Sequence, residues 1–527
     1  MNTLHRSLVI GTSALALVSC GADEITSPGT GGNITINNPP APAPTPTPTP
    51  TPTSTLVSPA GSCPTVANPV QLVNEGTISG PTGTYRVCTL PARITASTTL
   101  PYIAGLLYRL GGRTDVGTDG GPAPDASDGL SDTNVTLTIG AGAIVYASGN
   151  AWLNVNRGNR ISAVGTATRP IVFTSQDNVV GFNTINSSGQ WGGVVLSGRA
   201  PVTDCAASGA TPGTVGCERQ VEGAADPALY GGATVNDNSG TMSFVQIRYS
   251  GFVLSGNSEL QALTTGGTGT GTTLNNIMTY NSSDDGVEFF GGSVNVRNLI
   301  VVGHEDDGLD TDVGVKANMQ NVIVVMRPGV GDTIIEADTS LGTAVNNQTP
   351  RQNTQISNAT FIANSGVRDQ AVRLRGGTDY ALVNSILVDA GTPATPCLRI
   401  DDAETIQTSG SDELGVPRFN SFVLDCATDF RAGSSVTLAQ TQATYDAGTN
   451  NNAAFTRTLT GVFINGANEN AVPVFNPTAL SSFFTVPTNI GAAYPGNNTW
   501  INGWTCNSAT VTFDSAVSSC LSLPVYS

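Results

Sequence analysis

Charge and aromatic residues are scarce in this sequence. Only 12% of its 527 residues are charged and 6% are aromatic, and Lys316 is its single lysine. The formal net charge is −17, and the sequence pI is near 4.4. An acidic balance of this size argues against binding to nucleic acid and against electrostatic attachment to anionic lipid. The same balance is compatible with divalent cations and with neutral or cation-bridged polymers.

Histidine is nearly absent too, which limits the catalytic chemistry. There are two histidines: His5 lies in an N-terminal leader, and His304 is the only other candidate base. No GxSxG motif surrounds any serine, so a Ser-His-Asp triad has little support. The glycine-rich run Gly266–Gly271 lacks the lysine of a phosphate-binding loop, and we interpret it as a turn.

Residues 1–20 form a secretion signal. The apolar stretch from about Leu8 to Val18 is too short to span a membrane as a mature helix. The run Leu17–Cys20 (LVSC) resembles the lipobox of bacterial lipoproteins, which implies that Cys20 becomes the mature N-terminus and carries a lipid. Because Gly21 follows instead of aspartate, the resemblance implies the outer membrane. We therefore expect a lipid-anchored protein in the bacterial outer membrane, with its domain on the extracellular face.

Residues 21–60 form a linker between this anchor and the rest of the chain. Within it, Pro39–Thr53 reads PPAPAPTPTPTPTPT, a composition typical of polyproline II. Fifteen residues in that conformation reach roughly 45 Å. The linker is therefore predicted to be a semi-rigid stalk that holds a domain away from a membrane.

Eight cysteines remain once Cys20 is set aside. An even number in an exported chain favours disulfides over a metal or redox centre, and no CxxC motif occurs. Eight cysteines allow 105 connectivities. Their spacing favours pairing between near neighbours, although spacing alone leaves the other connectivities open. The four expected pairs are Cys63 with Cys88, Cys205 with Cys217, Cys397 with Cys426, and Cys506 with Cys520.

The stretch Asn281–Lys316 repeats one pattern twice. The triplet Asp284–Gly286 (DDG) recurs as Asp306–Gly308, 22 residues later, and the apolar run Val294–Val302 lies between them. A period in the twenties that is rich in Val, Ile, Asn and Gly indicates a solenoid of β-strands. One coil of such a solenoid needs about that many residues. The two acidic pairs are therefore expected to stack one above the other.

A second periodicity supports the solenoid. Five asparagines precede or lie within apolar runs, at intervals of 22, 23, 37 and 26 residues. Stacked asparagines at a β-helix corner can hydrogen-bond along the stack, whereas the alternative is that these are ordinary turn residues. The long interval fits one coil with an inserted loop at Thr339–Thr354. The five are Asn276, Asn298, Asn321, Asn358 and Asn384.

The region from about 134 to 330 resembles a family of bacterial surface lipoproteins. The motifs that carry the resemblance include LTIGAGAIVY, GQWGGVVLSGRAPV, SSDDGVEFFGGSVNVRN and EDDGLDTDVG. The resemblance implies an all-β fold, a right-handed parallel β-helix (solenoid) with N- and C-terminal caps. Some members are thought to accompany outer-membrane uptake receptors, so a receptor is an expected partner. We place the N-terminal cap at 61–133, the β-helix at 134–480 and the C-terminal cap at 481–527.

Acidic residues crowd the two repeats. Strands stacked about 4.8 Å apart bring like charges close enough to repel by about 1 kcal/mol in water, and by more where the dielectric is lower. Such a ladder favours a bound cation, and carboxylate oxygens suit Ca²⁺. The alternative is that Asp-Gly pairs serve only as corner residues. The predicted ligands are Asp284, Asp285, Asp306, Asp307 and Asp310, with Glu288 and Asp312 at the edge of the site.

Two functions remain open. The first is a non-enzymatic binding or assembly module at the cell surface, with Ca²⁺ in the acidic ladder and polysaccharide or a receptor as partner. The second is a calcium-dependent polysaccharide lyase acting on uronate polymers, with Lys316, Arg373 or Arg375 as the base. A lyase needs a basic residue facing the metal, whereas a structural ladder would tie its acids to Arg297 and to amides. A hydrolase with paired carboxylates ranks third.

Overall fold

The computed structural model describes residues 56–124, 130–256, 258–340, 348–364 and 369–526. The predicted leader, the lipidation residue Cys20 and the proline-rich run 39–53 lie outside the described residues. In the described part of the chain, no helix is long and apolar enough to cross a membrane. Thr55–Ser527 form one compact unit.

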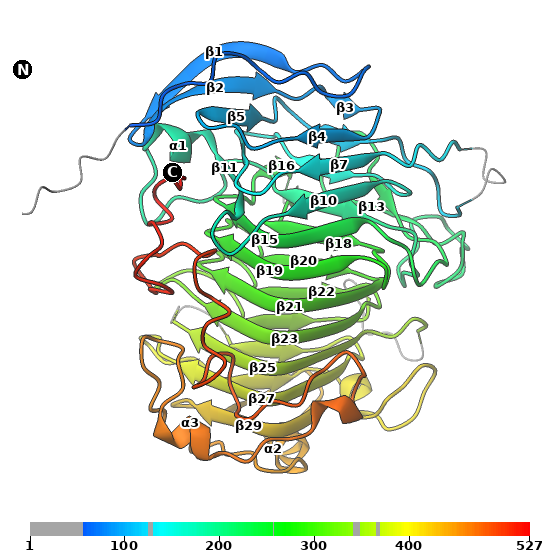
Figure 1. The fold of residues 1–527 in the computed structure, drawn as a ribbon. Helices are drawn as coiled ribbons and strands as arrows, with labels where there is room; N and C mark the ends of the chain where they lie inside the picture. Colours follow the sequence, from blue (N-terminus) through cyan, green and yellow to red (C-terminus); the bar gives the residue numbers. More distant parts are fainter. Residues whose placement is uncertain (1–55, 125–129, 257, 341–347, 365–368, 527) are drawn as a thin grey trace, which may run out of the picture. The chain divides into compact units, whose positions relative to one another are not determined.

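Two stacks of mostly parallel strands build the fold (Figure 1). The larger, here called sheet A, contains 15 strands among the described residues. Its strands are β1 (Val73–Gly80), β2 (Gly83–Thr89), β4 (Thr98–Leu100), β5 (Leu106–Arg109), β7 (Thr136–Ile139), β8 (Ile144–Ala147), β10 (Arg160–Val164), β11 (Ile171–Ser175), β15 (Gly240–Arg248), β19 (Thr273–Tyr280), β21 (Ser293–Val302), β23 (Lys316–Val325), β25 (Asn353–Ala363), β27 (Asp379–Asp389) and β29 (Arg418–Asp425).

The smaller stack, sheet B, contains 11 short strands, which pair in chain order. Each coil from β18 (Leu263–Gly266) onward thus contributes one long strand to sheet A and one short strand to sheet B. The strands of sheet B are β3 (Arg93–Ile94), β6 (Thr114–Val116), β9 (Leu153–Val155), β12 (Val194–Ser197), β18 (Leu263–Gly266), β20 (Val287–Phe290), β22 (Leu309–Asp312), β24 (Ile335–Ala337), β26 (Val372–Leu374), β28 (Leu398–Ile400) and β30 (Phe430–Ala432).

The remaining elements lie outside the two stacks. They are the hairpin of β13 (Arg219–Gln220) with β14 (Leu229–Tyr230), the hairpin of β16 (Val253–Ser255) with β17 (Ser258–Glu259), the α-helices α1 (Gln176–Val180), α2 (Leu438–Asp446) and α3 (Ala467–Ala471), and the 3₁₀ helices η2 (Ala403–Ile406) and η3 (Pro477–Ala479). The pairing of the long strands is parallel and in register, so the predicted all-β parallel β-helix is confirmed.

In each long strand, one residue with a left-handed backbone conformation lets apolar side chains on both sides of a bend point into the core. In β21 the core residues are Val294 and Val296 before Asn298, and Leu299 and Val301 after it. The spacing between successive core residues changes from two positions to three across Asn298, whose φ is +59°. Asparagine tolerates this conformation better than most residues. Without this extra residue, the second half of the strand would turn its apolar side chains away from the core.

The predicted asparagine ladder forms in part. Asn298 donates to Asn276 at 3.2 Å, and Asn321 donates to Asn298 at 2.9 Å. The other two members bond elsewhere: Asn358 donates to the carbonyl of Gly491, and Asn384 to that of Phe475. The ladder is therefore continuous over three coils and is then replaced by contacts with the C-terminal tail.

The C-terminal tail does not cap the last coil, and this prediction is wrong. From its contact with Asn384 on β27, the tail follows sheet A back toward the N-terminal coils. Thr485 bonds Gln320, and further along the tail the Trp504 carbonyl accepts from Gln246. Figure 1 shows this segment in red along the side of the stack, ending near α1. Apolar side chains that point outward from sheet A, such as Ile300 and Ile323, explain the path, because the tail covers them.

The other predicted boundaries also shift. Coils begin at β2 and β3, within the region expected to be a cap. The sequence did not reveal these coils, because short strands such as Thr114–Val116 carry no long apolar run. The stack ends at β30, and α2 follows there, with Tyr445 packed on Phe430. Part of the loop predicted at Thr339–Thr354 falls outside the described residues.

All four predicted disulfides are present: Cys63–Cys88, Cys205–Cys217, Cys397–Cys426 and Cys506–Cys520.

Candidate cation site

The two Asp-Asp-Gly triplets stack at the corners that precede β20 and β22. The backbone N–H of Asp307 donates to the Asp285 carboxylate at 2.8 Å, and the N–H of Gly286 donates to the Asp307 carbonyl at the same distance. One coil further, the N–H and hydroxyl of Thr333 both donate to Oδ1 of Asp307 at 2.6 Å. The corner interpretation therefore accounts for one oxygen of each carboxylate and leaves the other oxygen for a ligand.

A second row of acids lies on the strands of sheet B. Glu288, Asp310 and Glu336 occupy the same position on β20, β22 and β24, so their side chains follow one another along the stack. Asp285 and Glu288 are three residues apart, as are Asp307 and Asp310. The corner row and the strand row thus run side by side.

Together the two rows form four sets of three carboxylates. Within each set, one oxygen per residue lies within 4.8 Å of the others. Because Ca²⁺ binds oxygens at 2.3–2.6 Å, ligand atoms on opposite sides of the ion are up to about 5 Å apart. The sets fit a calcium ion. They are Asp284, Asp285 and Asp306; Asp306, Asp307 and Asp332; Asp285, Glu288 and Asp310; and Asp307, Asp310 and Glu336.

The four sets form two copies of one arrangement. Each copy contains two sets, and the second copy is shifted by one coil. Moving Asp285, Glu288 and Asp310 along the stack yields Asp307, Asp310 and Glu336. Asp310 belongs to both copies. The repeat follows from the fold itself, because a ligand set built on one coil recurs wherever the next coil carries the same residues.

The inner acids are buried without a cation partner. Asp285, Glu288, Asp310 and Asp312 are each at most 8% exposed. No described arginine or lysine lies within 4.0 Å of their carboxylates. One oxygen of Asp310 and one of Asp312 have no hydrogen-bond partner. A buried carboxylate in this state is costly unless a counter-charge is supplied.

Burial and mutual repulsion both disfavour the ionised acids. Desolvation, followed by repulsion from Asp306, raises the pKa of Asp284 to about 7. Desolvation likewise raises the pKa of Glu288 well above its ordinary range, with Asp312 as the largest repelling charge. The same two causes raise the pKa of Asp285, Asp307 and Asp310. A divalent cation would reverse this trend by stabilising the charged forms.

The basic residues expected near the acids lie elsewhere. Arg297, which a purely structural ladder was predicted to use, instead bonds Gln320 at 2.6 Å and stacks on Phe483 of the tail. Lys316 bonds Asp412 at 2.7 Å. The contacts of both residues thus leave out the predicted ligands. His304 is buried, with Nε2 3.2 Å from the Thr333 carbonyl.

Arg373 and Arg375 adjoin the acids but are engaged in ion pairs. Both bond Glu336 at 2.9 Å, Arg373 also bonds Asp401 at 2.8 Å, and Arg375 lies 3.1 Å from Asp338. Burial alone would lower the pKa of Arg373, but the bond to Asp401 and the field of Glu336 outweigh it, and the pKa is raised. A raised pKa is the opposite of what a general base requires.

Sequence reasoning missed Asp332 and Glu336. Each lies 26 residues after its counterpart, Asp306 or Asp310, whereas the preceding interval is 22. The turn after β23 is longer, so the Asp-Asp-Gly triplet does not recur literally. Aligning the apolar runs of β21 and β23 would have located both residues.

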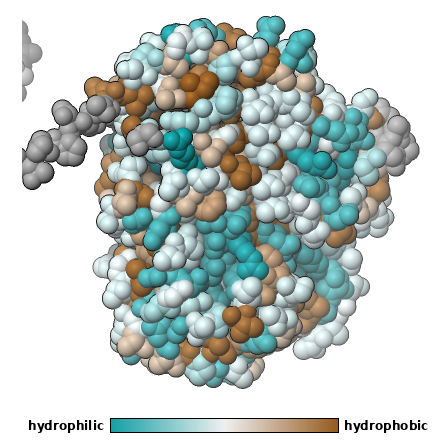
Figure 2. Space-filling view, viewed as in Figure 1, coloured by the Kyte–Doolittle hydropathy of each residue, from teal (hydrophilic) through white to brown (hydrophobic). Residues whose placement is uncertain are grey.

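The face shown in Figure 2 carries hydrophobic residues as small scattered patches, with hydrophilic residues between them. Scattered apolar residues are normal on a soluble surface and do not mark a docking site. The acidic site is therefore a stronger functional candidate than any apolar patch visible on this face.

Comparison with known proteins bears on the fold. A family model described as a pectate-lyase like beta helix domain matches residues 128–505, which is most of the chain. A search of curated proteins and a search of solved structures found no match. The matched region contains every strand of sheets A and B from β7 onward, and all four carboxylate sets lie within it.

Proposed function

Because the chain belongs to the pectate-lyase-like β-helix family, we propose that it is a calcium-dependent binding module for anionic polysaccharide at a bacterial cell surface. One observation carries the proposal: the same set of three carboxylates occurs on two consecutive coils. Its inner members Asp285, Glu288 and Asp310 are buried, and none of them pairs with a described arginine or lysine. Calcium would be held by Asp285, Glu288 and Asp310 and by Asp307, Asp310 and Glu336. Its role would be electrostatic, as the counter-charge to these acids.

The choice of an anionic polymer follows from charge. A chain of net charge −17 repels other anions, so it needs a divalent cation as a bridge. Asp306 is exposed, unlike Asp307 beside it, and it belongs to two of the four sets. A cation held there would be accessible to a carboxylate of the polymer. A uronate chain supplies such carboxylates at regular intervals.

The surface location is part of the proposal and rests on the N-terminal sequence. Cys20 would carry the lipid, the segment 21–60 would act as the stalk, and the outer membrane would be the site of attachment. Incorporation of labelled palmitate, lost in Cys20→Ala, tests the anchor. Digestion of the protein by protease added to intact cells tests exposure on the extracellular face, and resistance in intact cells with digestion after lysis would contradict it.

Retention on polygalacturonate and alginate beads tests the binding function. We expect retention of the purified protein in Ca²⁺ and its loss in EGTA. The double variant Glu288→Gln/Asp310→Asn should fail to bind, whereas Asp412→Asn, an acid-to-amide change at the Lys316 ion pair, should bind normally. Failure of the wild-type protein to bind either polymer in Ca²⁺ would overturn the proposed ligand class.

A polysaccharide lyase is the second candidate, and the family description favours it. Arg373 and Arg375 lie beside Glu336, a member of one carboxylate set, so a basic group adjoins the site. We rank it second because both guanidinium groups already have carboxylate partners and raised pKa values. Growth of the ultraviolet absorbance of unsaturated uronate ends, abolished by Arg373→Lys, would establish the lyase and displace the first proposal.

A further inference from the structure

A second charged site lies on the opposite stack, where the C-terminal tail crosses the end of β15. In β15, Val245 and Ile247 point into the core between the sheets. The alternating residues, Gln246 and Arg248, therefore point outward from sheet A. The tail covers them: the Gln246 amide donates to the Trp504 carbonyl, and Arg248 Nη1 donates to the carbonyls of Cys520 and Ser522.

Arg248 is unusual among the buried arginines of this protein. In the described part of the chain, three arginines are at most 1% exposed: Arg157, Arg248 and Arg351. Arg157 pairs with Asp119 and Glu218, and Arg351 pairs with Asp379 and Glu413. No described carboxylate lies within 4.0 Å of Arg248. Buried charges in proteins are normally paired, so this one is short of a counter-charge.

The hydrogen bonds of Arg248 lead to the same conclusion. Nε and Nη2 donate to the Gln246 side chain, and Nη1 donates to the two tail carbonyls, so four of its five N–H groups are engaged. All of these acceptors are neutral. Burial lowers the pKa of Arg248, and the nearby titratable groups are tyrosines: Tyr249, Tyr280 and Tyr526.

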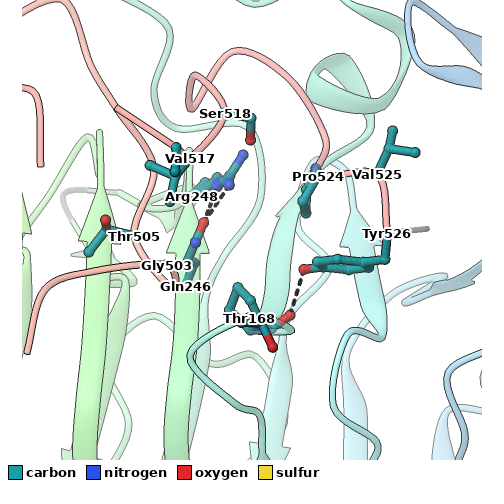
Figure 3. Close-up of a pocket in the computed structure, with 12 residues that line it drawn as sticks. Thr168, Gln246, Arg248, Gly503, Thr505, Val517, Ser518, Pro524, Val525 and Tyr526 are labelled. Atoms are coloured by element: carbon teal, nitrogen blue, oxygen red, sulfur yellow. Dashed lines mark hydrogen bonds between the residues drawn. The ribbon is translucent and has the colours of Figure 1, made fainter. Parts of the chain in front are cut away.

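A cavity of about 360 Å³ adjoins this guanidinium (Figure 3). Its floor is buried and includes Arg248, Gln246 and Thr505, whereas its rim includes the exposed residues Thr168 and Ser518. Apolar side chains of the tail form much of the remaining wall. A space of this size, largely apolar with a few polar groups at one end, is typical of a small-molecule site. The wall consists of Pro170, Ala516, Val517, Pro524, Val525 and Tyr526.

We propose that this cavity binds a small organic anion, a carboxylate on an apolar body, whose charged group pairs with Arg248. The carboxylate would accept from the remaining N–H of the guanidinium and from the hydroxyl of Ser518, and the apolar body would lie against Val517 and the tail. The site is on sheet A and the carboxylate sets are on sheet B, so the proposal is independent of calcium binding.

Titration of the full chain with benzoate tests the proposal, with benzamide as the neutral probe of the same shape and sodium chloride as the ionic-strength control. We expect saturable binding of benzoate by calorimetry and a rise in the unfolding temperature. Arg248→Met should weaken binding about 30-fold or more, since truncating one member of a buried charge pair is costly. Benzamide and chloride should produce no saturable response.

Because Arg248 also holds the tail, Arg248→Met can fail to fold, so a second variant is needed. Val517→Trp fills the cavity from its half-buried wall and leaves Arg248 and its bonds in place. It should unfold at the wild-type temperature without ligand and should not bind benzoate. Absence of benzoate binding by the wild-type protein, equal binding of benzamide, or undiminished binding by Val517→Trp would each overturn the proposal.

Discussion

One row of positions along sheet B divides into an acidic half and a basic half. Glu288, Asp310 and Glu336 are followed, in the same register, by Arg373, Arg399 and Arg431 on β26, β28 and β30. In the basic half, every guanidinium pairs with a described carboxylate. In the acidic half, Glu288 and Asp310 pair with none. Since the backbone is the same in both halves, the fold does not explain the missing partners.

The two halves meet at Glu336. Its carboxylate bonds both Arg373 and Arg375, and it also belongs to the carboxylate set of Asp307 and Asp310. Charges of opposite sign compensate one another on the side of β26, whereas like charges face one another on the side of β22. We therefore expect an external cation to compensate the acidic half. The following predictions test this expectation in order of expected effect.

The largest expected effect is on the calcium response of the acidic half. Glu288→Gln/Asp310→Asn should weaken Ca²⁺ binding by at least about 100-fold, because the number of charged ligands sets calcium affinity over several decades. The same variant should stabilise the calcium-free protein, because two repelling buried charges are gone. Thermal unfolding with and without Ca²⁺ measures both effects. A calcium-free variant that is less stable than the wild-type protein would show that the acids are structural.

The same kind of change in the basic half should have the opposite effect on stability. Arg373→Met removes one of the two arginine partners of Glu336 and of Asp401. It should destabilise the protein by about 1–3 kcal/mol, less than loss of a fully buried pair, because the Arg373 side chain is 24% exposed. Chemical denaturation measures the change. Calcium binding should persist, and its loss in this variant would mean that the two halves do not act separately.

The pH dependence of stability should reveal the acidic half in the absence of calcium. The folded-state pKa of Asp284 is about 7, above its ordinary value of 3.8, and that of Asp338 is about 6. Raised carboxyl pKa values stabilise the fold fully below about pH 4, and this contribution is lost as the pH rises through about 7. The unfolding temperature in EGTA should therefore fall between pH 5 and pH 8. Saturating Ca²⁺ should remove most of that fall.

The smallest expected effect is at Lys316. Its ion pair with Asp412 is partly exposed, with side-chain exposures of 31% and 35%, so Lys316→Met should cost less than about 1 kcal/mol. Calcium affinity should not change. A marked loss of calcium affinity in Lys316→Met, or a loss of any polymer cleavage, would mean that Lys316 takes part in the site despite its ion pair with Asp412.

The solenoid and its repeating corners could be predicted from sequence because both depend on local patterns. The interval between Asp285 and Asp307 predicted the stacking that the structure shows. Glu336 was missed because a longer turn changes the interval, and a fixed period cannot anticipate an insertion. Arg297 was placed near the acids by sequence distance, yet it lies on the sheet facing the tail. Which face a residue occupies depends on the bends of the coil.

The path of the tail was the hardest feature to predict. Trp504 lies more than 250 positions from Gln246 along the chain, and the bond between them follows no local pattern. Outward-facing apolar residues such as Ile300 implied that something covers sheet A. No feature of the sequence showed that the covering segment would be the tail itself.

Calorimetric titration of the metal-free protein with Ca²⁺ at neutral pH, alongside the variant Asp306→Asn/Asp307→Asn, tests whether the acidic half binds a cation. The variant removes charge from three of the four carboxylate sets while keeping side-chain size. We expect saturable calcium binding by the wild-type protein. The variant should bind fewer calcium ions, because only the set Asp285, Glu288 and Asp310 keeps all its charges. A wild-type protein that binds no calcium, or a variant that binds it equally well, would contradict the claim that the acidic half is built for a cation.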